Sequence, residues 1–320
     1  MRAYIIRRLI YTVIIAWGVL TITFVLLQIS PNRPADRYLA SMSARGTDPA
    51  QIVASIEARY GTDRPILQQY GEYMLNLVRG DWGWSLGTSL PVMELIKRHW
   101  IYSFQIILLS SIVAIIIGLL IGVYSAVKQY TKIDYAATFL SFIGISVPTF
   151  WLGIMLILIF AVQLGWFKTY YDTSLPIFSF ANLKALTLPV FTLATGMMAG
   201  YTRYARSSVL DNLRKDFVRT ARAKGLPERT VIWKHVLRNA MLPIVTILMF
   251  DLGSIVFGGA YLTEVIFGIP GLGRISFNAV FASDYPVVVA VTLIGALVVL
   301  LINLFTDIIY TWLDPRVRYE

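Results

Sequence analysis

The chain has 320 residues, of which 57% are hydrophobic and only 14% are charged. Ordinary soluble domains contain about 25% charged residues, so this composition indicates an integral membrane protein. The absence of cysteine excludes disulfide frameworks and thiolate metal sites, and two histidines leave little material for a metal centre. The net charge of +10 is not taken to indicate nucleic-acid binding, because the distribution of charge over the loops is more informative in a membrane chain.

Six stretches with few or no charges are candidate transmembrane helices, since one crossing takes about 20 apolar residues. They run over residues 9–29, 101–127, 135–167, 185–202, 239–263 and 285–306. The third is interrupted by Pro148, the fourth is short but can extend at either end, and the fifth contains one acid, Asp251. The first is too long for a typical signal-peptide core and lacks a small-residue cleavage site, so we interpret it as a retained anchor.

Lysine and arginine are unevenly distributed over the loops. With the N-terminus inside, the cytoplasmic segments hold 17 of them and the two short outer loops hold three. The long outer segment, residues 31–99, has eight basic and seven acidic residues, but long loops are poorly governed by the positive-inside rule. The expected fold is therefore all-α, with six transmembrane helices and both termini cytoplasmic.

The outer segment contains signals for two amphipathic helices. Asp48 is a suitable N-cap for the first helix, and Gly61 can end it. The second starts at Pro65 and ends at Gly80. Two interpretations remain open: these helices cover the membrane or the outer ends of the spans, or they dock a delivery protein.

A basic inner loop between the fourth and fifth spans predicts two short helices set at an angle by Gly225, Leu226 and Pro227. The first is indicated by apolar residues at helical spacing, namely Val209, Leu213, Phe217, Thr220 and Ala221. The second would pack with Val231, Ile232, Val236 and Leu237 and display Arg229, Lys234 and Arg238. Such a loop could lie flat on anionic headgroups. The rigid corner instead favours a lever that enters a groove of a partner, since a surface-lying helix needs no break there.

Residues 219–225 (RTARAKG) and 235–243 (HVLRNAMLP) resemble the EAA loop of binding-protein-dependent ABC importer permeases. The general pattern has Glu-Ala-Ala six, five and four residues before its glycine. Here Arg219, Thr220 and Ala221 occupy those positions, so only the last alanine and Gly225 match. The form is similar to the loop of the peptide/nickel branch.

The resemblance extends over most of the chain. The branch's other motifs are matched by residues 6–9, 80–83, 146–153, 264–273, 284–286, 303–307 and 314–316. The long outer segment resembles that of the first, B-type, of the two permease subunits in such systems. Lys168 and Thr169 depart from the branch, which often has a proline and a glycine there.

The resemblance implies a type I ABC importer permease fold in a bacterial or archaeal cell membrane. It implies an N-terminal part, residues 1–100, with the anchor helix and the outer segment 31–99, and a permease core, residues 101–315, with the inner loop at about 206–240. The expected partners are a second homologous permease forming a heterodimer, two cytoplasmic ATPase subunits, an extracytoplasmic solute-binding protein and membrane lipid. This chain would bind no cofactor, because ATP and Mg would be held by the partner subunits; a phosphate-binding loop is absent from its sequence.

The resemblance also assigns the inner loop to coupling with the ATPase. The coupling residues are Arg219, Thr220, Ala221, Arg222, Ala223, Lys224, Gly225, Leu226, Pro227, His235 and Leu237. Asp251 and Asn303 are candidates for the translocation path, since acids inside a membrane are functional candidates by default. Asp251 would contact a cationic group of the cargo; alternatively it pairs with the partner subunit or faces water. No residue is expected to be catalytic or to bind a metal.

Other classes of protein fit less well. An ion-coupled secondary transporter usually has more than one embedded acid or paired broken helices. An intramembrane hydrolase would need paired aspartates or a Ser-His couple, and a scaffold would leave the basic corner unexplained. Peptides are the expected cargo, with nickel chelates, glutathione and oligosaccharides as alternatives in this branch.

Overall fold

The computed structural model describes residues 2–29, 48, 51, 54, 64–85, 87–254, 260–282 and 284–313. These residues form helices joined by turns and loops, with one isolated bridge between Trp84 and Pro91, so the expected all-α fold is confirmed. They group into two compact units, Met1–Ile101 with Arg274–Leu297, and Tyr102–Gly273 with Val298–Glu320. The division predicted between residues 100 and 101 stays a prediction. The helix expected over residues 48–61 falls almost entirely outside the described residues.

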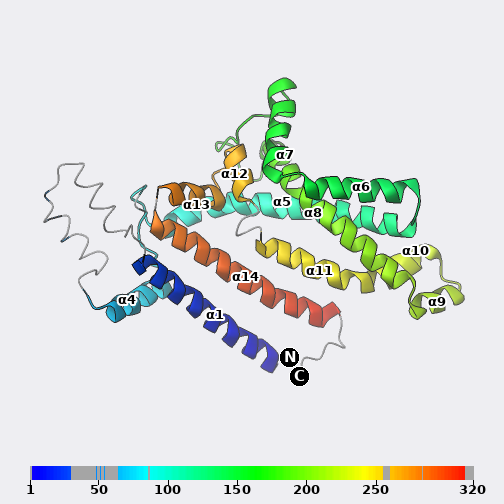
Figure 1. Ribbon diagram of the computed structural model, residues 1–320, viewed down its shortest axis with the longest axis horizontal. Helices are drawn as coiled ribbons and strands as arrows, with labels where there is room; N and C mark the ends of the chain where they lie inside the picture. The colour runs from blue at the N-terminus through cyan, green and yellow to red at the C-terminus, as the bar shows by residue number, and fades with distance from the viewer. Residues whose placement is uncertain are drawn as a thin grey trace. The chain divides into compact units, whose positions relative to one another are not determined.

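In the first unit, α1 (Arg2–Ile29) carries α4 (Ile66–Arg79) on its C-terminal half (Figure 1). The Phe24 ring lies 5.3 Å from that of Tyr70 and 5.4 Å from that of Tyr73. As predicted, α4 starts after Pro65 and ends at Gly80, whose φ of 84° is left-handed. The amphipathic helix therefore packs on the C-terminal half of α1, and both of its expected roles stay predictions.

The same unit joins two of the motifs that carry the family resemblance. The Asp284 carboxylate is buried and accepts hydrogen bonds from the Ser85 hydroxyl at 2.5 Å and from the Gly87 N–H at 3.0 Å. Gly83 lies against Pro286, the second residue of α14 (Tyr285–Leu313). Gly83, Ser85 and Gly87 are thereby held at the start of α14.

In the second unit, α5 (Val92–Val127) and α8 (Phe180–Leu213) approach each other closely. A Cβ atom on Gly118 would lie 2.8 Å from the Met198 carbonyl oxygen, and one on Gly122 would lie 2.6 Å from that of Thr202. These glycines are one helical turn apart, which is the spacing that allows membrane helices to pack backbone against backbone. Two small residues on α5 thus set the distance between these two long helices.

The third predicted span is broken. α6 (Lys132–Ser146) is followed by α7 (Thr149–Leu156), which continues as a π-helix over Ile157–Gln163, and the two arms meet at 98° (Figure 1). Pro148 lacks an N–H and disfavours the helical conformation of Val147, which is extended with a ψ of 122°. The interruption at Pro148 was expected, but the right-angled turn was not.

The described residues contain three candidate spans, or up to five if each bent pair of helices is one span. α5, α8 and the Tyr285–Thr306 part of α14 are each long and apolar enough to cross a membrane. The bent pair α6–α7, and the pair from Glu228 to Met249 that bends by 52° at Pro243, raise the number to five. The apolar part of α1, Leu9–Val25, is shorter than these spans. Six spans and cytoplasmic termini therefore remain predictions.

Candidate functional site

The predicted inner corner is present in the structure. α8 ends at Leu213, and Lys215 adopts an extended conformation that precedes the short helix α9 (Asp216–Ala223). Gly225 follows with a left-handed φ of 74°, as expected, and Pro227 caps α10 (Glu228–Thr230). A π-helix over Val231–Val236 then leads without a break into α11 (Leu237–Ser254). We call residues 216–236 the corner segment.

The apolar side of the corner segment is buried against α5 and α8. Its cluster contains Val123, Ala126, Val209, Val218, Ala221, Val231, Ile232, Val236 and Ala240. The prediction that Phe217 and Thr220 share the apolar face was wrong, because the extended Lys215 shifts the phase of α9 and turns Val218 and Ala221 inward. The packing residues predicted for the second helix are confirmed.

An ion pair closes the corner on its outer side. The Arg222 guanidinium donates to both oxygens of the Glu228 carboxylate, at 3.1 and 2.6 Å. The hydrogen bonds with Glu228 raise the pKa of Arg222 above its ordinary value, so this side chain stays charged. Both side chains are about half exposed, at 45% and 53%, and such pairs contribute less than about 1 kcal/mol. The shape of the corner therefore depends mainly on the left-handed Gly225 and the buried cluster.

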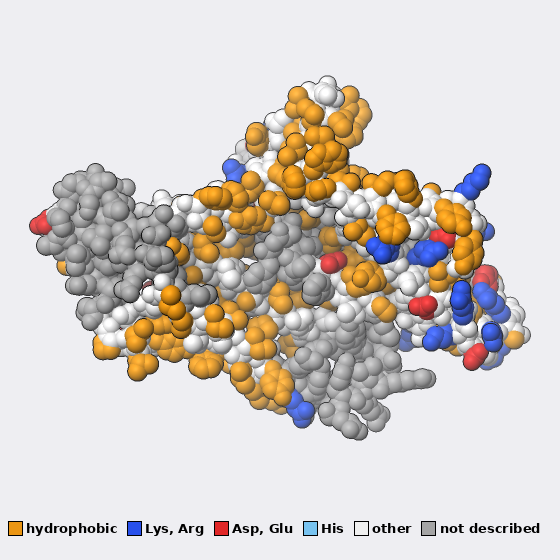
Figure 2. Space-filling model, in the orientation of Figure 1, with side chains coloured by type: hydrophobic (Ala, Val, Ile, Leu, Met, Phe, Trp, Pro, Cys, Tyr) orange, Lys and Arg blue, Asp and Glu red, His pale blue; other side chains and the backbone are white. Residues whose placement is uncertain are grey.

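The residues predicted for ATPase coupling form one exposed surface. The exposed members are Arg219, Thr220, Arg222, Ala223, Lys224, Gly225, Leu226 and Pro227. Ala221 is buried beneath them, and His235 and Leu237 are half-buried. Figure 2 shows Lys and Arg side chains gathered over α9 and α10. A polar, basic corner is thus presented to the outside while its apolar side is covered by the chain's own helices.

A second charged network, absent from the sequence-based predictions, fixes the helices beside the corner. The Asp134 carboxylate at the start of α6 is 1% exposed and accepts from Arg206 of α8 at 2.6 and 2.8 Å. The Ser125 hydroxyl of α5 and the Tyr130 N–H donate to the same carboxylate, at 2.5 and 2.9 Å. One carboxylate therefore joins α5, α6 and α8. The only sequence signal was a lone acid in the first turn of an apolar helix.

A third buried carboxylate lies against two glycines of the motif at residues 264–273, Gly271 and Gly273. Glu264 of α12 (Tyr261–Phe267) is fully buried and accepts from the Ser103 hydroxyl at 2.5 Å. That hydroxyl also accepts the Leu272 N–H at 2.8 Å, where α13 (Leu272–Phe281) begins. A Cβ atom on Gly271 would overlap the Glu264 carboxyl group, so glycine is required for this contact.

The two candidates for the translocation path lie apart from the corner. Asp251 is half-buried on α11, and its carboxyl group interacts with the buried Tyr201 of α8. It lies about 21 Å along the helix from Leu237, at 1.5 Å per residue. Asn303 lies on an exposed side of α14. The structure therefore brings the coupling residues together but does not join them to these two.

Comparisons with known families and proteins give consistent matches. A family profile described as "Binding-protein-dependent transport system inner membrane component" matches residues 118–319, and the profile of its N-terminal part matches residues 1–92. The chain is 41% identical to the oligopeptide transport system permease protein AppB of Bacillus subtilis, over the full length of both. It is 38% identical to the dipeptide transport system permease protein DppB of Alkalihalophilus pseudofirmus, again over both full lengths.

Two further matches concern a permease for another cargo and the fold. The chain is 34% identical to the glutathione transport system permease protein GsiC of Escherichia coli K12, over 99% of each chain. A structure of the MetNI methionine ABC transporter in an inward-facing conformation aligns with a TM-score of 0.54 at 21% identity, covering 69% of this chain and 97% of the other. This likeness shows that the chain has the type I ABC importer permease fold.

Proposed function

We propose a function from one premise: this chain belongs to the family of binding-protein-dependent transport system inner membrane components. As a permease of this family, it forms one transmembrane half of an ABC importer. Its cargo is di- and oligopeptides, delivered by an extracytoplasmic binding protein. Peptide cargo is supported by the two relatives of 41% and 38% identity. They are named as oligopeptide and dipeptide permeases, and they match over their full lengths.

The rest of the assembly follows from the same premise. A second, distinct permease subunit completes the pathway in the cell membrane, and two cytoplasmic ATPase subunits supply the energy. ATP and Mg are bound by those subunits, and this chain receives their motion. Residues 101–315 act as the permease core, whereas residues 1–100 add the anchor helix and the outer segment.

The observation that carries the coupling role is the way the corner segment is mounted. A helix that lies on a membrane keeps its apolar face for lipid. Here Val218, Ala221 and Val236 face α5 and α8 instead, and the exposed side is the polar corner around Gly225. A partner that grips this corner would move α5 and α8 with it, because the cluster leaves little freedom between them. Coupling requires a contact that differs between two states, and a stiff corner can provide one.

Within the pathway, we assign Asp251 to the lining of the translocation route. Its carboxyl group is half-buried and interacts with Tyr201, where α5, α8 and α11 pack around Ala114 and Ala194. An acid in this place would attract the amino terminus of a peptide. Asn303 would supply a neutral polar group farther along the route.

Uptake by the complete transporter in proteoliposomes tests the proposed function. The chain is reconstituted with its second permease, both ATPase subunits and the binding protein, and entry of a labelled dipeptide is measured. We expect uptake that requires ATP hydrolysis and continues after a protonophore collapses the proton gradient. Excess unlabelled dipeptide should compete, whereas glutathione and a nickel chelate should not. Uptake that follows the proton gradient without ATP would contradict the importer and favour a secondary transporter.

A further inference from the structure

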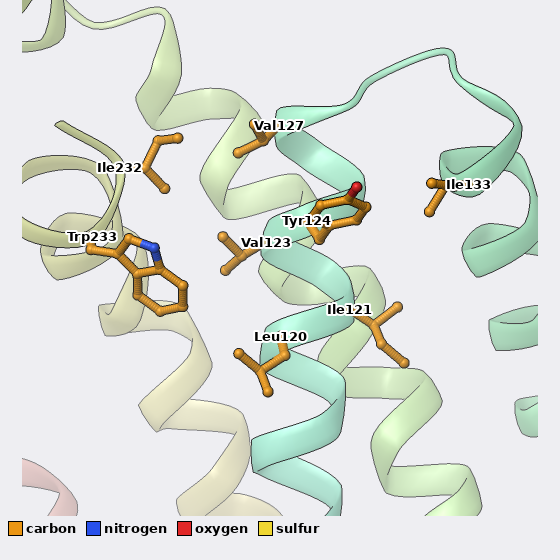
Figure 3. A pocket seen from close by; sticks show the side chains of 8 residues that line it. All are labelled: Leu120, Ile121, Val123, Tyr124, Val127, Ile133, Ile232 and Trp233. Carbon is orange, nitrogen blue, oxygen red and sulfur yellow. The ribbon is translucent and has the colours of Figure 1, made fainter. Parts of the chain in front are cut away.

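An open apolar groove of about 470 Å³ lies at the C-terminal end of α5, beside the corner segment (Figure 3). Leu120 and Tyr124 of α5 form its floor, Ile133 of α6 closes one side, and Ile232 and Trp233 of the corner segment close the other. Apart from the Tyr124 hydroxyl and the indole N–H of Trp233, the side-chain atoms that line it are apolar, six residues being aliphatic and two aromatic. Its volume lies within the range of small-ligand sites, about 300–1,000 Å³.

The groove lies where the apolar part of the chain meets the basic inner part. The uncharged run of α5 ends at Val127, and the exposed lysines Lys128 and Lys132 follow directly. Tyr124 and Trp233 are both about half exposed, at 50% and 46%. Tyrosine and tryptophan are enriched at the level of the headgroups, with an apolar ring below and a polar atom above. The groove therefore extends from the acyl-chain region of the membrane to its inner surface.

The charge at the mouth of the groove is positive. Lys128 and Lys132 lie on either side of the turn that joins α5 to α6, and Lys234 is exposed next to Trp233. The three acids of α6 and the corner segment, Asp134, Asp216 and Glu228, are each paired with an arginine. An apolar slot below a cluster of lysines is complementary to an anionic phospholipid, which has an acyl chain below a phosphate.

We propose that this inner groove is a binding site for an anionic phospholipid. One acyl chain lies between α5 and the corner segment, and the phosphate lies near Lys128 and Lys132. The regulatory consequence rests on the proposed function: because the lipid touches Ile232 and Trp233, it stabilises the segment through which the ATPase acts. The importer would then couple best in membranes rich in anionic lipid.

Fluorescence quenching in the complete transporter tests the site directly. The transporter is placed in nanodiscs with increasing fractions of brominated phosphatidylglycerol or brominated phosphatidylcholine, since bromine quenches a tryptophan that it touches. The contribution of Trp233 is the difference between the wild type and Trp233→Phe. One lysine near an anionic membrane contributes roughly a fivefold preference for anionic lipid. We therefore expect half-maximal quenching by phosphatidylglycerol at a lipid fraction at least about fivefold lower than that needed with phosphatidylcholine.

Matched variants separate a built site from general membrane charge. Lys128→Gln with Lys132→Gln should remove the preference for phosphatidylglycerol, whereas Lys168→Gln with Lys184→Gln should keep it. A second measurement counts the lipids that the transporter retains in native mass spectra. Ile133→Trp on α6 fills the groove and should lose one anionic lipid. Ile116→Trp on α5, outside the groove, should retain it. Equal quenching by both lipids would overturn the proposal, and so would a Trp233 that neither lipid quenches, since a protein would then occupy the groove. Neither readout depends on uptake, so failure here leaves the importer function standing.

Discussion

Buried carboxylates join parts of this chain that are far apart in the sequence. Asp134 lies 72 residues from Arg206, and Glu264 lies 161 residues from Ser103. A charge taken out of water is costly unless it is paired and hydrogen-bonded. Asp134 should therefore be sensitive to the loss of its partner and Glu264 to a change in its packing, and each gives a prediction at the scale of one residue.

Gly271→Ala should destabilise the second unit. The added methyl group would overlap the Glu264 carboxyl group, which the Ser103 hydroxyl and the surrounding backbone hold in place. Overpacking of this kind costs about 1–3 kcal/mol, so the melting temperature of the purified transporter should fall. Gly200→Ala is the matched control, because a Cβ atom there has nothing within 4 Å, and it should leave the melting temperature unchanged or higher. Equal melting temperatures for both variants would contradict the assigned packing of Glu264.

Arg206→Met should cost considerably more than the loss of an exposed pair. It leaves the Asp134 carboxylate buried without its main partner, a change worth about 3–5 kcal/mol when an ion pair is buried. Adding Asp134→Asn should recover part of that loss, because the remaining buried group is then neutral. Arg219→Met, which removes a pair exposed at 77% and 94%, should change the melting temperature little. A double variant no more stable than the single one would show that the pair does not carry this stability.

Neither the Asp134–Arg206 pair nor the Glu264–Ser103 contact was predictable from the sequence, for a physical reason. The acid at position 134 and the arginine at position 206 flank different apolar runs, and only the packing of α6 on α8 brings them together. Glu264 belongs to the motif at residues 264–273 that carries part of the family resemblance, but its buried hydrogen bond is made with Ser103 of another helix. Gly225, by contrast, was predictable because a left-handed residue between two helical patterns is a local property.

At the level of elements, the apolar runs predicted the positions of the helices well, but they did not predict the angles between helices or which face of α9 is buried. α14 starts at the predicted residue, Tyr285, and runs past the predicted end to Leu313. α8 extends beyond residues 185–202 at both ends, as expected. α5 starts nine residues before the predicted span, and Glu94 and Arg98 pair one turn apart in this additional part of the helix. The phase of α9 was wrong because one extended residue, Lys215, resets the helical face. Composition locates helices, whereas single breaking residues set their angles.

Gly225→Val should uncouple transport while insertion and assembly continue. A left-handed conformation costs about 1–2 kcal/mol for a residue with a side chain, so the corner should change its angle. Gly165→Val is the matched control, since Gly165 has a φ of 66° and, like Gly225, has nothing within 4 Å of its Cβ position. We expect peptide uptake to fall at least tenfold for Gly225→Val and to stay near wild type for Gly165→Val. Normal uptake by a well-assembled Gly225→Val transporter would contradict the role of the corner.

At the scale of the whole molecule, the exposed apolar side chains indicate how much of the chain other molecules cover. Large hydrophobic residues of α1, α5 and α6 are exposed over much of the surface in Figure 2. Lipid and a second permease are the partners that would bury such faces in a membrane. The corner segment differs, because its exposed side is polar and its apolar side is already covered. We therefore expect a cytoplasmic protein to bind there.

Site-specific cross-linking at the corner tests this expectation most directly. The chain has no cysteine, so Ala223→Cys places a unique thiol on the exposed side of α9. In the assembled transporter, a short thiol-reactive cross-linker at this position should join the chain to an ATPase subunit, and ATP should change the yield. Val162→Cys, which is exposed at the far end of the α7 arm, should give no such product. If Ala223→Cys instead stays open to soluble thiol reagents and never cross-links to the ATPase, the corner is not the coupling site.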